Sequence, residues 1–251
     1  MDNHTVCILV YTHDEYSFMW NIMTSLLKKY APDIKIHWLT NDSTPQELID
    51  TYIPDTWTLH KYDSNLIWTK RFIECLNNID SEYILFLHED WLPIGPVIPK
   101  RLEEVTNFMY KEKCGFLLSY SHYTRTDIQD GIPTLDPEYR FYKEDNHIFQ
   151  PAIWNKLVFQ DFCISLNKTK HQNEDGECLH FMDLKNCWSI QNTSTVRSLR
   201  TTNAYFFPHM HALSQGLWNF TKYPTLENLL QSYGVDTKTR GIHPWWELDT
   251  Q

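Results

Sequence analysis

Glycine is scarce in this sequence, at 7 of 251 residues, and no glycine-rich phosphate-binding loop is present. Neither the Walker pattern G-x-x-x-x-G-K-[ST] nor the dinucleotide-binding pattern G-x-G-x-x-G occurs. The nucleophile-elbow pattern G-x-S-x-G is also missing, which disfavours a serine or cysteine hydrolase. A phosphate-bearing ligand would therefore have to be held in another way.

Positive charge and long apolar runs are also missing. The formal net charge is −10, and no basic stripe occurs. This excludes wide contact with nucleic-acid phosphates and favours a sugar-rich or small-molecule partner. No signal peptide is recognisable, and no apolar run approaches membrane-spanning length, so we expect no transmembrane segment.

The cysteines point to a reducing compartment. None of the six forms a C-x-x-C pair, and Cys7, Cys75 and Cys114 lie in apolar segments where free buried thiols are common. We therefore expect a cytoplasmic protein. Few glycines with many Asn, Thr and aromatic residues are typical of AT-rich genomes, including viral ones, which would place the protein in a host cytoplasm.

What is present predicts a globular α/β fold. Hydrophobic residues make up 42% of the chain and aromatic residues 15%, and no linker is visible, so we expect a single domain over residues 1–251. Apolar runs predict buried strands at 5–11, 34–39, 57–62, 83–88, 115–120 and 149–154. Helical spacing predicts helices ending before Pro32 and at 44–52, 68–79, 99–113 and 156–166. The alternation up to Asp90 favours a parallel sheet with right-handed crossovers.

The apolar run 83–88 is the most informative segment of the sequence. It stops abruptly at Glu89 and Asp90 and is closed by Pro93. Ligands of open α/β sheets bind just outside the carboxyl ends of strands. Carboxylates there can hold a hard divalent cation, which in turn can hold phosphates. The alternative is a solvated carboxylate pair that caps a turn.

Three strand ends share this polar character: Tyr11-Thr12-His13, Asn41-Asp42-Ser43 and His88-Glu89-Asp90. Together they resemble the nucleotide-sugar domain of GT-A glycosyltransferases over residues 5–120. The resemblance implies a Rossmann-type mixed, mostly parallel sheet flanked by helices, with a loop-rich C-terminal acceptor region. Residues 1–120 would form the nucleotide-sugar-binding half and residues 121–251 the acceptor-binding half.

The resemblance also implies roles for particular residues. Thr12 would lie beside the nucleotide, Asp42 would contact the base or ribose, and Asp90 would be the last carboxylate of the metal motif. Lys70 and Arg71 occupy the region where family members touch the donor.

The sequence departs from the family at His88, which replaces the first Asp of the Asp-x-Asp motif, with Glu89 between. His88 could be a second metal ligand or contact the ribose, so metal dependence stays open.

His209 and His211 are two residues apart and would face one site in an extended segment, like the late metal-binding histidine of such enzymes. Imidazole suits Mn²⁺ better than Mg²⁺. The alternative for this pair is two surface histidines beside an aromatic strand.

The remaining candidates lie in the second half. Asp175 is the first choice for a catalytic base and Glu177 the second, with Asp161 and Asp183 also possible. A solvated acidic loop is the alternative. Trp154 and Trp218 could stack on an acceptor sugar, although most tryptophans belong to the core.

The predicted function is transfer of a sugar from a nucleoside-diphosphate sugar, UDP-linked rather than GDP-linked, to a glycan or other hydroxyl acceptor. We expect inversion of configuration, with a front-face retaining route left open. One alternative is a carbohydrate-binding or scaffold protein without turnover, which the replacement at His88 favours. A nucleotidyltransferase is another alternative, and the absence of Gly and Lys from residues 11–14 counts against it.

Overall fold

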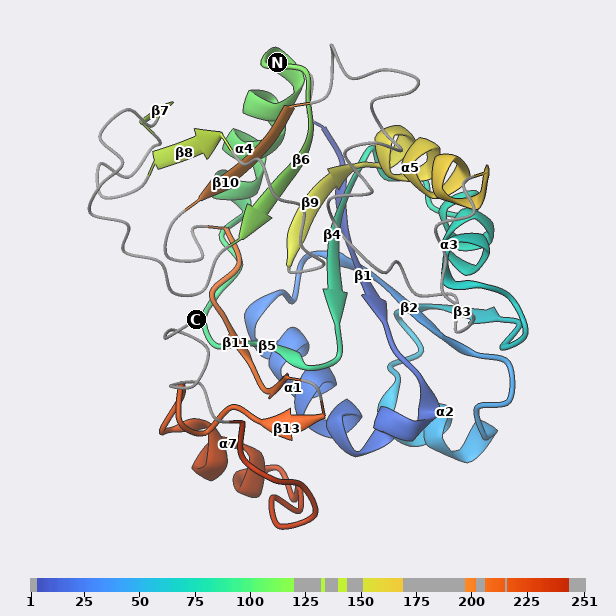
Figure 1. Ribbon diagram of the computed structural model, residues 1–251, viewed down its shortest axis with the longest axis vertical. Helices are drawn as coiled ribbons and strands as arrows, with labels where there is room; N and C mark the ends of the chain where they lie inside the picture. The colour runs from blue at the N-terminus through green and yellow to red at the C-terminus, as the bar shows by residue number, and fades with distance from the viewer. Residues whose placement is uncertain are drawn as a thin grey trace.

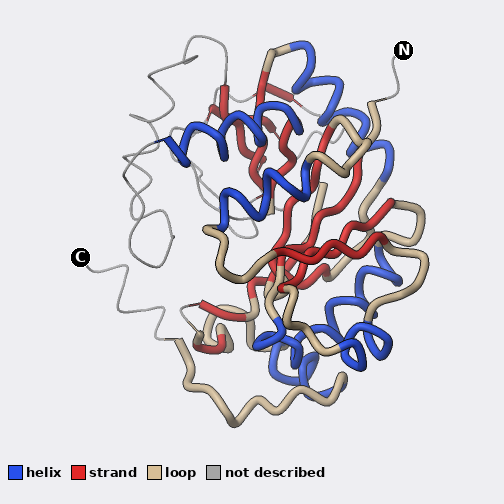
Figure 2. Tube along the Cα trace, turned by 90° about the vertical axis from the view of Figure 1, so that its right-hand side faces the viewer, coloured by secondary structure: helices blue, strands red, loops and turns tan. Residues whose placement is uncertain are grey.

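The computed structural model describes residues 4–119, 132–133, 140–143, 151–168, 197–201, 206–214 and 216–243. A nine-stranded sheet in the order β3-β2-β1-β4-β9-β6-β10-β8-β7 forms its centre, and helices lie on both faces (Figure 1). Figure 2 shows the same layers from the side. The strands of this sheet are β1 (Val6–Tyr11), β2 (Lys35–Asn41), β3 (Thr58–Tyr62), β4 (Tyr83–His88), β6 (Cys114–Ser119), β7 (Ile132–Pro133), β8 (Arg140–Lys143), β9 (Ala152–Asn155) and β10 (Arg197–Thr201).

The first half of the chain is a run of parallel strands. β1 pairs in parallel with β2 on one side and with β4 on the other, and β3 pairs in parallel with β2. Near-continuous apolar runs suit these strands because both faces of a parallel sheet are covered by helices. The predicted β-α-β order up to Asp90 is confirmed.

The second half completes the sheet with strands of both directions. β9 lies between β4 and β6 and is antiparallel to both. β10 is parallel to β6, whereas β8 is antiparallel to β10. The predicted α/β class with a mixed, mostly parallel sheet is therefore confirmed.

The helices are short. They are η1 (Asp14–Met19), α1 (Trp20–Tyr30), α2 (Gln46–Tyr52), α3 (Trp68–Leu76), α4 (Pro99–Lys111), α5 (Lys156–Lys168) and α7 (Leu226–Ser232). Within the described ranges, every helix is too short or too polar to cross a lipid bilayer.

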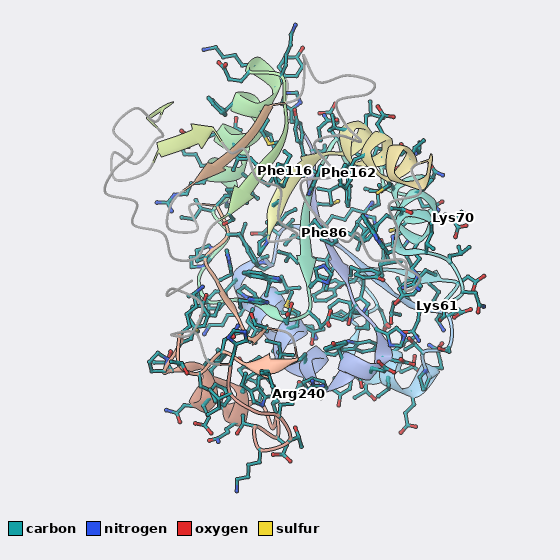
Figure 3. All side chains as sticks on the ribbon, viewed as in Figure 1. Lys61, Lys70, Phe86, Phe116, Phe162 and Arg240 are labelled. Atoms are coloured by element: carbon teal, nitrogen blue, oxygen red, sulfur yellow. The ribbon has the colours of Figure 1, made fainter. Side chains whose placement is uncertain are left out.

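Successive residues of the central strands point to opposite faces of the sheet and pack into two separate hydrophobic cores. Ile8 and Leu85 point into a core shared with α1, α2, α4 and α7, and Leu9 and Phe86 point into a core shared with α3 and α5. Figure 3 labels Phe86 with Phe116 and Phe162, which belong to the second core. Cys7 and Cys75 are free, buried thiols in this second core, as predicted.

Two small ribbons lie beyond the main sheet. β5 (Trp91–Pro93) pairs with β11 (His209–His211), and β12 (Leu213–Ser214) pairs with β13 (Leu217–Trp218), both antiparallel. The first ribbon brings the C-terminal part of the chain to the end of β4. It does not follow from sequence periodicity.

His37 on β2 and His60 on β3 form a stacked pair, with 2.8 Å between His37 Nδ1 and His60 Nε2. His37 is only 1% exposed. Burial, followed by the neighbouring His60, lowers the pKa of His37 from 6.5 to about 4. Burial also lowers the pKa of His60.

We expect His37→Gln to flatten the acid side of the stability profile. Because the folded-state pKa of His37 is depressed, the unfolded chain takes up the proton first as pH falls from 6.5 towards 4, and stability is lost across that window. The loss attributable to this residue is at most about 3.4 kcal/mol. Urea unfolding of both proteins at a series of pH values from 7 to 4.5 measures it. Parallel profiles would contradict the assignment.

Candidate active site

The carboxyl ends of β1, β2 and β4 meet at one edge of the sheet. The parallel register places Tyr11 opposite Leu39 on β2 and opposite His88 on β4. The three polar strand ends of the sequence are therefore neighbours in space. This edge is where open α/β sheets bind ligands.

Thr12 holds the turn after β1 and is only 2% exposed. Its backbone N–H donates to Leu39 O, and its hydroxyl accepts a 2.8 Å hydrogen bond from Trp20 Nε1. Its carbonyl accepts from the hydroxyl of Tyr62. The Thr12 side chain is therefore bonded inside the protein, and the predicted position of Thr12 beside a nucleotide stays a prediction.

Asn41, at the end of β2, fastens the first two strand ends together. It is fully buried, and its side-chain oxygen accepts a 2.9 Å hydrogen bond from the backbone N–H of Asp14. The hydroxyl of Thr44 donates to the same oxygen. The sequence prediction passed over Asn41 in favour of its acidic neighbour, although a buried amide after a strand is itself a sign of such a role.

Asp42 is exposed and lies next to the loop after β3. Its Oδ1 accepts hydrogen bonds from the Ser64 hydroxyl at 2.8 Å and from the Ser43 N–H at 2.9 Å. The hydrogen bond from Ser64 is the main cause that lowers the pKa of Asp42, so the carboxylate is ionised. Its proposed contact with a base or ribose stays a prediction.

Arg71, on the first turn of α3, is turned towards this edge. Nη1 donates to the Tyr11 hydroxyl at 2.8 Å, Nε to Leu66 O at 2.7 Å and Nη2 to Ser64 O at 2.9 Å. Its guanidinium also lies 4.6 Å from the centre of the Tyr62 ring. Lys70 is exposed on the outer side of the same helix (Figure 3). Of the two residues predicted to contact the donor, only Arg71 bonds to residues at the strand ends, through Tyr11 and Ser64.

The turn after β4 begins with a half-buried histidine. The His88 ring packs edge-on against Tyr11 and Phe86, at centroid distances of 5.5 and 5.1 Å. Burial lowers the pKa of His88, and the nearby Asp90 opposes that effect. His88 is therefore neutral.

Glu89 points inward, with 5% of its surface exposed. Burial, and secondly the charge of Asp90, raises the pKa of Glu89 well above its usual range, while a hydrogen bond with the Thr12 hydroxyl acts in the opposite direction. Its Oε2 has no hydrogen-bond partner in the described part of the chain. Burial therefore favours the protonated form of this carboxyl group.

Asp90 and His211 form the centre of the site. His211 Nε2 lies 3.1 Å from Asp90 Oδ2, and the two side chains are 20% and 19% exposed. Asp90 Oδ1 has no hydrogen-bond partner among the described residues. Because β11 lies beside β5, Asp90 O also accepts a 2.7 Å hydrogen bond from Ala212 N–H.

Trp91 fixes the imidazole of His211. The two rings are parallel within 1°, with centroids 3.9 Å apart. Ser214 Oγ lies 3.4 Å from Nδ1 of the same histidine, and Asn219 Nδ2 donates to His211 O at 2.7 Å. Groups that hold the far nitrogen and the backbone of a metal-binding histidine commonly set its orientation.

His209 faces the same side of β11 as His211, as period-2 spacing predicts, and its ring lies edge-on to Trp91 at 5.1 Å. It is 2% exposed, and its Nδ1 donates to Phe207 O at 2.6 Å. His209 pairs with Pro93, whereas His211 pairs with Trp91, so His209 lies two residues farther along the ribbon from Asp90. The pair thus divides into one histidine at the carboxylate and one in the interior.

Two further residues, missed in the sequence, lie beside the acidic turn. Burial raises the pKa of Tyr16, and Glu89 and Asp90 raise it further, while the positive charge of Arg240 opposes them. The Arg240 guanidinium lies 4.8 Å from the centre of the Phe18 ring and donates to Gly216 O at 3.1 Å. A cation from the C-terminal part therefore lies near Tyr16, 5.8 Å from the centre of its ring.

The donor atoms at Asp90 and His211 fit a divalent cation bound together with substrate. Asp90 Oδ2 and His211 Nε2 lie 3.1 Å apart, so the carboxylate and the imidazole would hold a divalent cation together. The unpartnered Asp90 Oδ1 leaves a lone pair for the same ion. In the described ranges no three His, Cys, Asp or Glu residues converge, so substrate oxygens and water would complete the coordination.

The predicted acceptor residues are corrected. Trp154 is 4% exposed, and its ring packs on Phe116 and Phe159 at 4.4 and 4.8 Å. Trp218 is fully buried and stacks on Phe220. Neither offers a face to a sugar, because both ring systems are covered by other side chains.

The candidate bases Asp175 and Glu177 lie outside the described residues, as does Asp183. Asp161 is exposed on α5, on the side of the molecule that carries α3. The choice of base stays a prediction.

We expect Arg71→Ala to lower the free energy of unfolding by at least about 1.5 kcal/mol, because three hydrogen bonds to a charged group are lost. Lys70→Ala, one residue away and exposed, is the matched control and should change stability by less than about 0.5 kcal/mol. Urea unfolding followed by tryptophan fluorescence measures both. Equal effects of the two substitutions would contradict the assigned contacts.

Comparisons with known proteins found likeness in structure but not in sequence. No protein-family model and no curated protein matches the chain in sequence. Among solved structures, 4-diphosphocytidyl-2C-methyl-D-erythritol synthase from Anaerococcus prevotii superposes with a TM-score of 0.49 at 10% identity, covering 93% of this chain and 96% of its own. TarS from S. aureus gives 0.45 at 11% identity, covering 81% and 59%. The glycosyltransferase GlyE of Streptococcus pneumoniae gives 0.45 at 12%, covering 78% and 45%. Likeness at this level carries no activity or substrate over to this chain.

Proposed function

We propose that this protein is a glycosyltransferase that moves a sugar from a nucleoside-diphosphate sugar to a hydroxyl group of a glycan or other acceptor. One observation carries the proposal: Asp90 and His211, 121 positions apart in the chain, meet at 3.1 Å at the carboxyl edge of the parallel strands. That edge also carries an ionised Asp42 and the inward-turned Arg71.

The chemistry explains why such groups are useful. Departure of a nucleoside diphosphate develops negative charge on its phosphates, and a divalent cation held by Asp90 and His211 would neutralise that charge. Trp91 keeps the imidazole in one orientation, so Nε2 is presented without loss of side-chain freedom. Asp42 accepts hydrogen bonds from ribose hydroxyls or the base, and Arg71 holds Tyr11 and the loop after β3 around the nucleoside.

The donor is proposed to be UDP-linked and the cation Mn²⁺. An imidazole ligand beside a carboxylate suits Mn²⁺ better than Mg²⁺, which prefers oxygen ligands alone. Inversion of configuration requires a carboxylate base on the acceptor side, and Asp175 is our first candidate, followed by Glu177.

Calorimetric titration of UDP and of GDP, each with Mn²⁺ or with EDTA, tests the nucleotide site. We expect UDP to bind in the presence of Mn²⁺ and to bind at least about tenfold more weakly in EDTA, in Asp90→Asn and in His211→Gln. Asp33→Asn, an exposed carboxylate remote from the site, is the matched control and should bind UDP as the wild type does. Failure of the wild type to bind either nucleotide would overturn the proposal.

Substitution of the candidate bases tests the catalytic step. With UDP-Mn²⁺ binding established, Asp175→Asn should lower the rate of sugar transfer about 10²- to 10⁴-fold and leave UDP affinity unchanged, because a general base acts only on the acceptor hydroxyl. Glu177→Gln should have a smaller effect. Product analysis by NMR then reads the anomeric configuration. Unchanged rates in both variants would remove this pair from the mechanism.

A carbohydrate-binding protein without turnover is the second candidate. The observation that favours it is the His88 ring, which packs against Tyr11 and Phe86 at the position where the resemblance expects a carboxylate. On this hypothesis glycan binding would persist in Asp90→Asn, and no donor sugar would be consumed by the wild type.

A further inference from the structure

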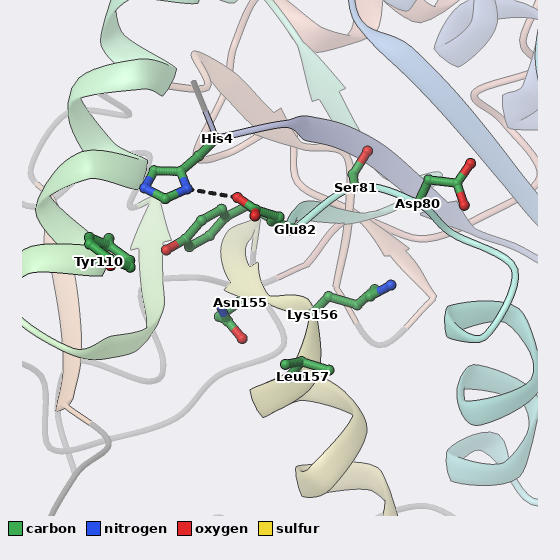
Figure 4. Close-up of a pocket in the computed structure, with 9 residues that line it drawn as sticks. His4, Asp80, Ser81, Glu82, Tyr110, Asn155, Lys156 and Leu157 are labelled. Carbon is green, nitrogen blue, oxygen red and sulfur yellow. Dashed lines mark hydrogen bonds and ion pairs between the residues drawn. The ribbon is translucent and has the colours of Figure 1, made fainter. Parts of the chain in front are cut away.

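A cavity of about 340 Å³ lies at the edge of the sheet opposite Asp90, where β1 and β4 begin (Figure 4). Its walls come from His4, from the residues that lead into β4, from the last turns of α4 and from the start of α5. The volume lies within the range of small-molecule sites. No residue of the candidate active site lines it.

Two apolar side chains are exposed at this cavity. Tyr110 on α4 and Leu157 on α5 are each 65% exposed, the highest value among the exposed large hydrophobic residues of the described ranges. They come from different helices and border the same cavity (Figure 4). Single exposed apolar residues are ordinary, but two that converge on one hollow mark a surface that a ligand can cover.

The ring of Tyr110 is supported from behind. His4 packs against Tyr110 at 4.9 Å and edge-on against the buried Tyr83 at 5.4 Å. His4 Nδ1 also lies 2.7 Å from Glu82 Oε2, the contact drawn as a dashed line in Figure 4. His4 therefore links the Tyr110 ring to Tyr83 and Glu82 at the start of β4.

Carboxylates outnumber ammonium groups among the described residues that line the cavity. Asp80 and Glu82 contribute carboxylates, and Glu82 keeps 59% of its side chain exposed. Lys156 is the single lysine among the described residues that line the cavity; its Nζ donates a hydrogen bond to Ile79 O at 2.7 Å and points away from Tyr110 (Figure 4). Asn155 adds an amide whose oxygen accepts from Val158 N–H. Phosphates and other anions are disfavoured by this set.

We propose that this cavity binds a neutral sugar ring of a glycan. A pyranose has an apolar C–H face and a rim of hydroxyl donors, and the cavity offers a tyrosine ring with a leucine side chain for the face and carboxylates with an amide for the rim. Sugar hydroxyls donate to Glu82 and accept from the Asn155 amide. This inference does not rest on the proposed transferase activity, because it concerns the opposite edge of the sheet.

Binding of defined trisaccharides tests the inference. The probes are maltotriose and N,N′,N″-triacetylchitotriose as neutral ligands and trigalacturonate as an anionic one, followed by saturation-transfer NMR and calorimetry. We expect at least one neutral probe to bind, with Tyr110→Ala weakening it about tenfold. Tyr110→Phe, which keeps the ring, should bind within about twofold of the wild type. Trigalacturonate should not bind.

Ile98→Ala is the matched control, since Ile98 is an exposed apolar residue that does not line the cavity, and it should leave trisaccharide affinity unchanged. Tyr110→Ala should bind UDP in the presence of Mn²⁺ with the same affinity as the wild type. The nucleotide titration and the trisaccharide titration therefore test the two sites independently. Absence of binding of both neutral probes to the wild type, or binding that survives Tyr110→Ala, would overturn the inference.

Discussion

The pairing of β11 with β5 is the contact on which the candidate active site depends. β5 carries Trp91 directly after Asp90, and β11 carries His211. Hydrogen bonds from Ile94 N–H to Pro208 O and from Ala212 N–H to Asp90 O close the two ends of this short ribbon. Two residues that are far apart in the chain are thereby held within one hydrogen bond of each other. Closing such a long loop costs conformational entropy, which the ribbon and the stacked rings offset together.

Electrostatics around the turn follow from that pairing. Glu89 and Asp90 are consecutive carboxyl groups that would repel each other if both were charged. Burial keeps Glu89 protonated, whereas Asp90 lies against His211. The positive charge of Arg240, from the C-terminal part, lowers the pKa of Tyr16 and so opposes the effect of the two acidic residues. The turn thus combines the buried, protonated Glu89 with the Asp90–His211 pair, and the guanidinium of Arg240 lies near Tyr16 beside it.

Much of the first half could be read from the sequence, because each parallel strand is a continuous apolar run that stops at polar residues. The end of β4 at His88 and the polar turn at Asp42 are examples. Periodicity says nothing about which distant segments pair, so the position of His211 beside Asp90 needed the structure. Residue type alone is also misleading. Tryptophan is common in sugar-binding sites, but Trp154 lies on β9, between β4 and β6, and is buried there. Asn41 was passed over because its acidic neighbour Asp42 was the more obvious ligand, although Asn41 accepts the hydrogen bond from the Asp14 backbone.

The position of β9 has a consequence for how the protein is made. This strand, at residues 152–155, separates β4 from β6, so the two halves suggested by the sequence are interleaved in one sheet. While the ribosome has delivered only the first 120 residues, β4 has an open edge and β6 has no place to dock. Such edges are prone to pairing with other chains. The first 120 residues therefore cannot complete their part of the sheet ahead of the rest, because β9 and β10 come later in the chain.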